Sequence, residues 1–145
     1  LAEALQFLRN CRSVLRADGT LRLSTPNLDW VWLTHYKHPS RLTEEERLLG
    51  CLEMNRAFHG WGHQFLWNLH TLTMALEAAG FADVVSQSYG QSSTAELHDL
   101  ERHERHADLP EAPSVIVVEA GGIGADASLR FEEIIGPYVR DAAAR

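Results

Sequence analysis

One short segment near the end of the chain limits the possible folds more than any other. Residues 115–118 read Val-Ile-Val-Val, with no polar side chain among them. A strand with one face in water alternates apolar and polar residues, so a continuous apolar run is typical of a strand covered on both faces. The chain has 145 residues, which is enough for one domain with a core of its own.

Two other segments predict strands. Residues 20–25 alternate between apolar and polar side chains, and Pro26 is expected to end that strand because proline has no N–H to give to a ladder. Residues 81–89 predict a third strand around Val84 and Val85. Together with 115–118 these are the only convincing strands in the sequence.

Apolar residues at helical spacing predict helices over 1–15, 28–33 and 69–79. Asn27 and Asn68 are the expected N-caps of the second and third of these. Thr43 and Glu46 have the spacing of a capping box, which predicts a further helix through Leu52. Two less regular segments, 95–106 and 128–135, also predict helices.

Strands that alternate with helices imply an α/β fold with a layered sheet. Three strands make a thin sheet for such a domain. The chain also begins inside a predicted helix and not at a methionine. Both observations favour one part of a larger domain.

Charge and composition exclude several classes of function. The formal net charge is −7, and an acidic surface repels a phosphate backbone, so nucleic-acid binding is disfavoured. No apolar run approaches the roughly 20 residues that span a bilayer, and no basic-then-apolar leader is present. Cys11 and Cys51 are far apart and favour two reduced thiols. We therefore expect a cytoplasmic protein that binds neither membrane nor nucleic acid.

Two passages resemble class I S-adenosylmethionine (SAM)-dependent methyltransferases. Residues 11–27, CRSVLRADGTLRLSTPN, resemble the family's R-V-L-K-P-G-G-x-L-x-I-x-x-P passage, which is the helix before the fifth strand and that strand. Residues 72–84, LTMALEAAGFADV, resemble its L-x-x-L-L-x-x-A-G-F-x-x-V passage, the helix that leads into the sixth strand. Residues 115–119 resemble the seventh strand, which the family inserts antiparallel between the fifth and sixth.

The resemblance implies the C-terminal part of a Rossmann-like methyltransferase sheet over 1–121, with a helical insert at about 28–68 and an antiparallel last strand. Residues 122–145 are then a linker and a C-terminal helical tail. SAM is the implied cofactor. The family's glycine-rich turn after its first strand is absent, and the Gly-Gly-Ile-Gly at 121–124 follows the last strand, so we interpret it as a flexible linker. The cofactor-binding residues stay unassigned, and this chain alone is expected to bind SAM weakly or not at all.

The passage FHGWGH at 58–63 is similar to one in a subset of bacterial methyltransferases. Trp61 is a candidate for stacking on the substrate, and His63 and His59 are candidate general bases. The alternative is a core tryptophan with locally bonded histidines. A zinc site on His59 and His63 is a weaker interpretation, because glycines between them disfavour the helix that would align both rings.

Thr25 and Asn27 lie where the first predicted strand ends, the edge at which open α/β sheets bind ligands. We assign both to substrate binding, with a strand exit and an N-cap as the alternative. A second group of titratable residues lies in the predicted helix 95–106, and a solvated face is favoured there over a zinc site. Its members are His98, Glu101, His103 and His106. Trp30, Trp32 and Tyr36 are interpreted as packing residues or part of a lid.

The first hypothesis for function is methyl transfer from SAM to a small-molecule acceptor, with this chain forming the acceptor side of the site. The alternative is a non-catalytic, degenerate methyltransferase-like module that forms a homodimer through the exposed edge of strand 20–25. A zinc-dependent hydrolase that uses His59 and His63 is the third.

Overall fold

The computed structural model describes residues 1–36, 42–60, 62–102, 104–124, 131, 133, 135 and 136. In chain order its elements are α1 (Ala2–Val14), β1 (Leu21–Pro26), α2 (Leu28–His35), α3 (Glu44–Asn55), a π-helical turn η2 (Arg56–Gly60), α4 (Leu69–Ala78), β2 (Asp83–Gln87), a short 3-10 turn η3 (Ala95–Leu97) and β3 (Val115–Gly121). The fold is mixed α/β.

The three strands form one open sheet in the order β1-β3-β2. β3 is antiparallel to both neighbours, with Leu21 opposite Ala120 on one side and Asp83 opposite Gly121 on the other. The prediction of an antiparallel last strand between the other two is confirmed. Every residue of β3 except the last is buried, as its apolar run predicts.

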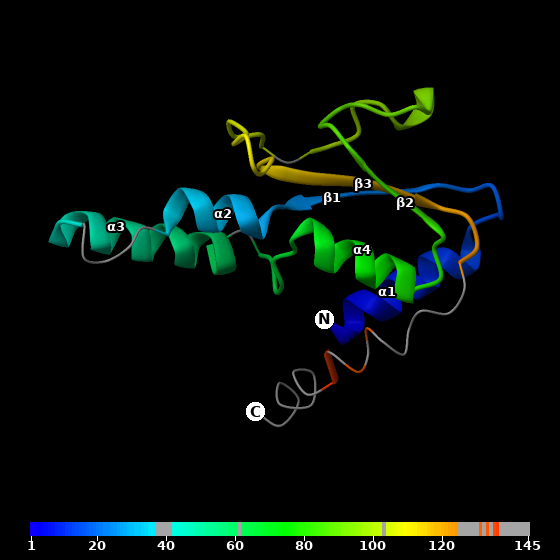
Figure 1. Cartoon of the computed structure of the whole chain (residues 1–145), viewed down its shortest axis with the longest axis horizontal. Helices are drawn as coiled ribbons and strands as arrows, with labels where there is room; N and C mark the ends of the chain where they lie inside the picture. Colours follow the sequence, from blue (N-terminus) through cyan, green and yellow to red (C-terminus); the bar gives the residue numbers. More distant parts are fainter. Residues whose placement is uncertain are drawn as a thin grey trace.

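Helices α1 and α4 cover one face of the sheet (Figure 1). Apolar side chains from both helices meet those of β3 in the main core, where each fully buried side chain contributes roughly 1.5–3 kcal/mol. This core includes Leu5, Leu8, Leu72, Leu76, Ile116 and Val118, together with Phe81, which follows α4. This core explains why the apolar stripes of the two helices could be recognised from their spacing.

The segment between β2 and β3 crosses the opposite face of the sheet (Figure 1). We call residues 88–114 the strap; residue 103 within it lies outside the described residues. The predicted helix over 95–106 is wrong, because only Ala95–Leu97 forms a helical turn. Asp99 adopts a φ of 53°, a left-handed conformation that ends a right-handed helix. The strap is instead held by contacts with the sheet.

The predicted helix starts are confirmed. Asn27 Oδ1 accepts a hydrogen bond from the N–H of Asp29 at 3.0 Å, and Asn68 Oδ1 accepts one from Thr71 at 2.9 Å. Thr43 and Glu46 form the reciprocal capping box at the start of α3. α2 and α3 form an arm that extends away from the sheet (Figure 1), and a second small core lies at its base. That core consists of Trp30, Val31, Ala57, Leu66 and Ala112.

The Gly-Gly-Ile-Gly segment, which its composition predicts to be a linker, packs closely against neighbouring backbone and side chains. Gly122 has a φ of 65°, and a Cβ there would lie 2.7 Å from an Asp83 carboxylate oxygen. A Cβ on Gly124 would lie 2.8 Å from the Phe81 carbonyl oxygen. The N–H of Gly124 also donates to Gly80 at 3.0 Å. These glycines therefore allow the chain to pack tightly against the start of β2.

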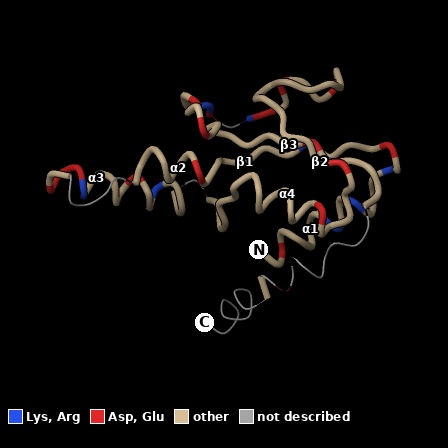
Figure 2. The backbone as a smooth tube through the Cα atoms, in the orientation of Figure 1, with Lys and Arg blue, Asp and Glu red and all other residues tan. Residues whose placement is uncertain are grey.

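Most of the predicted tail at 128–135 lies outside the described residues. Of those that are described, Phe131 is buried in the main core. No helix within the described ranges is long and apolar enough to cross a membrane. Figure 2 shows basic residues spread over several elements among acidic ones.

Candidate functional site

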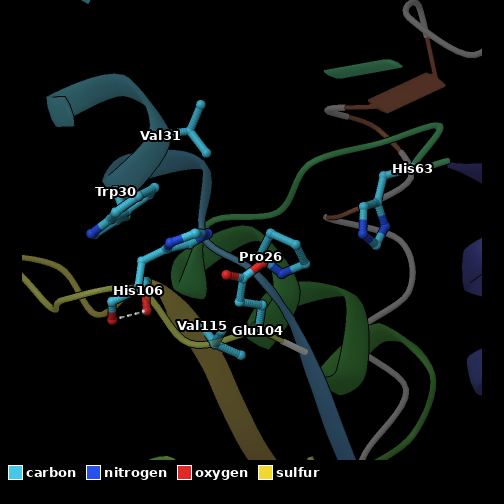
Figure 3. Close-up of a pocket in the computed structure, with 8 residues that line it drawn as sticks. Pro26, Trp30, Val31, His63, Glu104, His106 and Val115 are labelled. Carbon is cyan, nitrogen blue, oxygen red and sulfur yellow. Dashed lines mark hydrogen bonds between the residues drawn. The ribbon is translucent and has the colours of Figure 1, made fainter. Parts of the chain in front are cut away.

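A cavity of about 280 Å³ lies where β1 ends and β3 begins. It is on the strap side of the sheet and at the base of the helical arm (Figure 3). Its lining combines four apolar side chains with two histidines, a serine and one carboxylate: Pro26, Trp30, Val31, His63, Glu104, His106, Ser114 and Val115. We call it the Trp30 pocket.

Trp30 is held in place from three directions. Its indole Nε1 donates to the carbonyl of Ala107 at 2.9 Å. The ring of His106 stacks on it, with centroids 5.3 Å apart and planes 16° from parallel. The ring of His35 meets it edge-on at 5.7 Å. The side chain is thus a rigid aromatic wall, and its polar N–H is already satisfied.

A polar cluster fixes the part of the strap that carries His106. Asp108 Oδ1 accepts hydrogen bonds from the backbone N–H of Ser114 at 2.8 Å and from its hydroxyl at 3.0 Å. The same hydroxyl lies 3.0 Å from the His106 carbonyl, so its one proton serves either acceptor. Arg105 pairs with Asp108 at 2.8 Å. The hydrogen bonds from Arg105 and Ser114 lower the pKa of Asp108 and keep it ionised.

Two polar groups in the pocket are available to a ligand. Within the described part of the chain, the Glu104 carboxylate and the ring nitrogens of His106 make no hydrogen bond or ion pair. Figure 3 shows both beside Pro26, while His63 lies apart from them, beyond Pro26. His63 is half-buried. An imidazole on each side of an apolar cavity gives the site groups that can accept or donate a proton.

The structure brings only one of the predicted site residues into this pocket, which is His63. His59 is exposed at the end of η2 and does not line the cavity. Trp61 lies outside the described residues. Thr25 faces α1, where it lines a separate cavity of about 160 Å³.

Asn27 is 3% exposed, and its side chain is used for structure. Besides capping α2, its amide Nδ2 donates to the carbonyl of Pro113 at 2.9 Å. Its backbone N–H donates to Ser114 at 3.1 Å. These bonds support the N-cap interpretation, and the residue joins the end of β1 to the end of the strap.

Sequence reasoning missed Trp30, Glu104 and His106 as pocket residues. Trp30 was interpreted as packing, and His106 was placed on a solvated helix face. The pocket depends on a stack between residues far apart in the chain, for which no local pattern exists. The only available signal was an aromatic residue in the first turn of the helix that Asn27 was predicted to cap.

The histidine groups do not form a metal centre in the described ranges. No three His, Cys, Asp or Glu side chains described by the structure lie close enough together to hold a metal ion. His103 lies outside those residues. His98 and Glu101 do not share a helix face, because the helix predicted over 95–106 does not form.

Glu101 instead joins a buried ion-pair network on the strap side of the sheet. Arg22 of β1 donates through Nε to Glu101 at 2.8 Å and through Nη1 to Glu119 of β3 at 2.6 Å. Gln87 of β2 donates to Glu119 at 3.0 Å, and the N–H of Gly90 donates to Glu101 at 3.1 Å. The network therefore links all three strands to the strap.

Burial and hydrogen bonding shift the pKa values of the two glutamates of this network in opposite directions. The side chains of Arg22, Glu101 and Glu119 are only 4%, 1% and 8% exposed. Desolvation acts to raise the pKa of each glutamate, but the hydrogen bonds that each accepts, including those from Arg22, outweigh it and lower the pKa. Desolvation acts to lower the Arg22 pKa, and its two carboxylate partners raise it instead. The three groups are therefore held in their charged forms.

Comparison of the chain with protein-family models, with curated proteins and with solved structures finds no match.

Proposed function

We propose that this chain forms the acceptor side of a class I SAM-dependent methyltransferase and binds a small acceptor in the Trp30 pocket. The observation that carries the proposal is the sheet order β1-β3-β2 with β3 antiparallel to both neighbours. It is the arrangement that the resemblance implies for the fifth, seventh and sixth strands of a Rossmann-like methyltransferase sheet. α1 and α4 precede β1 and β2 and cover the same face, as helices do in such crossovers.

The position of the pocket also supports the proposal. Open α/β sheets bind ligands beyond the carboxyl ends of their strands. Pro26, the last residue of β1, lines the pocket. In methyl transfer the protein mainly aligns the acceptor and excludes water, and a base takes a proton where the acceptor must lose one. Trp30, Pro26 and Val115 supply the rigid apolar walls, and His63 and His106 supply the imidazoles.

Our proposal gives the described residues no part in binding SAM. Gly122 and Gly124 pack closely against Asp83 and Phe81. The Asn27 amide at the end of β1 bonds to Asp29 and Pro113. SAM, when bound, supplies the methyl group. We assign no contact with it to this chain.

The proposal is tested on the intact gene product that contains this chain. Isothermal titration with SAM is expected to show saturable binding, and radiolabelled methyl from SAM is expected to enter a small acceptor. Trp30→Phe and His106→Gln are expected to lower methyl transfer while SAM binding is unchanged, because both residues belong to the acceptor pocket. Absence of SAM binding by the intact protein would contradict the proposal.

A second candidate is an interaction module that forms a homodimer through the β1 edge. Among the described residues β1 pairs only with β3, so its other edge has no strand partner there. Phe7 of α1 is 57% exposed beside that edge and lines the cavity that also contains Thr25 and Trp67. Apolar surface next to an open edge favours association.

Light scattering measures the molar mass in solution and so tests whether the protein forms this homodimer. A dimer that Phe7→Glu converts to a monomer is the expected result, with Val14→Glu as the control because Val14 is also exposed on α1 but does not line the cavity. A wild-type monomer at all concentrations would contradict it.

A further inference from the structure

We propose that the Trp30 pocket selects a small organic amine in its protonated, cationic form. This inference rests on the proposed function, since it names the class of acceptor that the same pocket takes. It begins with the charges of the described residues in the lining, among which Glu104 is the one side chain with a carboxylate or a permanent charge. No Arg or Lys is found among these described lining residues.

The cation next to Glu104 in the sequence has other partners. Arg105 is its neighbour in sequence, but the Arg105 guanidinium pairs with Asp108 at 2.8 Å and lies over the ring of Tyr89 at 5.3 Å. No described residue forms an ion pair or a hydrogen bond with the Glu104 carboxylate. The pocket thus presents a negative charge whose partner the described protein does not supply.

Two further polar groups of the lining already have partners within the protein. The Trp30 N–H is donated to Ala107, and the Ser114 hydroxyl is used by His106 and Asp108. The walls beside Glu104 are apolar: Pro26, Val31, Val115 and the Trp30 ring. A ligand with an apolar body and one cationic end complements this combination, because the body covers the walls and the charge meets the carboxylate.

The volume of the pocket limits the size of that ligand. About 280 Å³ lies at the lower end of the range of small-molecule sites, which is about 300–1,000 Å³. A molecule with one aromatic ring and a short aminoalkyl group has a suitable size and chemistry for this pocket. Trp30 offers an aromatic surface both to such a ring and to an ammonium group.

Three probes of matched shape and different charge test the inference: benzylammonium, benzyl alcohol and benzoate. Titrations of the protein at neutral pH are followed by isothermal calorimetry and by the Nε1–H resonance of Trp30, which is identified from Trp30→Phe. Benzylammonium is expected to bind about fivefold more tightly than benzyl alcohol, the equivalent of about 1 kcal/mol, which is the upper end for an ion pair with an exposed carboxylate such as Glu104. Benzoate is expected not to bind.

Glu104→Gln is expected to remove the preference for benzylammonium and to leave the affinity for benzyl alcohol unchanged. Glu96→Gln is the matched control, because Glu96 is an exposed glutamate of the same strap that does not line the pocket. Equal binding of all three probes, tighter binding of benzoate, or an unchanged preference in Glu104→Gln would overturn the inference. SAM is absent from these titrations, so their outcome is separate from that of the SAM-binding test.

Discussion

Arg22 connects β1 with the strap and with β3 through two ion pairs. Its guanidinium lies between Glu101 of the strap and Glu119 of β3, almost fully removed from solvent. Two carboxylates and one guanidinium leave the group with an excess negative charge. Such a cluster is stable only while its cation is present, because an uncompensated buried carboxylate is costly.

Replacement of Arg22 by glutamine should therefore destabilise the fold strongly. We expect a loss of about 3–5 kcal/mol in the free energy of unfolding, the usual cost of removing one partner from a buried pair. Urea denaturation measures it. Arg16→Gln is the control, because Arg16 is exposed and should change stability by about 0.5 kcal/mol or less. Equal effects of the two substitutions would show that the network is not important for stability.

The lowered pKa values of Glu101 and Glu119 make stability depend on pH in a defined direction. An unfolded chain takes up protons near the ordinary glutamate pKa of about 4.3, while the folded network takes them up only at lower pH. The stability contributed by the network is therefore complete above that range and is lost as pH falls through the folded pKa values. Urea midpoints measured over acidic pH should show this loss. Glu101→Gln should make the dependence shallower, and an unchanged slope would argue against the shift.

At the scale of elements, the sequence predicted the features that depend on residues close together in the chain. The three caps at Asn27, Thr43 and Asn68 are confirmed because each uses a side chain within three residues of its partner. The helix expected over 95–106 failed because its polar residues have distant partners: Glu101 bonds to Arg22, and the N–H of Asp99 donates to Gly90. The pocket was recognised only at His63 for the same reason.

The two asparagine caps should differ in their contribution to stability. The Asn68 side chain makes only the capping hydrogen bond of α4 among the bonds described above. Asn68→Ala is therefore expected to lower the free energy of unfolding by about 1 kcal/mol. Asn27 caps α2 and also donates to the Pro113 carbonyl, so Asn27→Ala should cost about 1 kcal/mol more. Chemical denaturation of both variants measures the difference. If their costs are the same, the bond to Pro113 makes no net contribution.

At the scale of the whole molecule, the strap contributes residues both to the ion-pair network and to the Trp30 pocket. Its Glu101 joins the ion-pair network over the sheet, and its Glu104, His106 and Ser114 line the Trp30 pocket. Loss of the Glu101 contact is therefore expected to disturb the pocket as well as the sheet. The sequence indicated the number and order of the strands, but it held no signal for this long-range link.

The central position of β3 has a consequence for how the protein is made. β1 and β2 form no ladder with each other, and both pair with the strand that is synthesised after them. Until Val115–Gly121 has emerged from the ribosome, the backbone N–H and C=O groups of β1 and β2 lack the β3 partner that they have in the described part of the fold. The helices can form during synthesis, whereas the sheet closes in one late step that joins residues far apart in the chain. The nascent protein is thus most exposed to misfolding and to chaperones just before its last strand is complete.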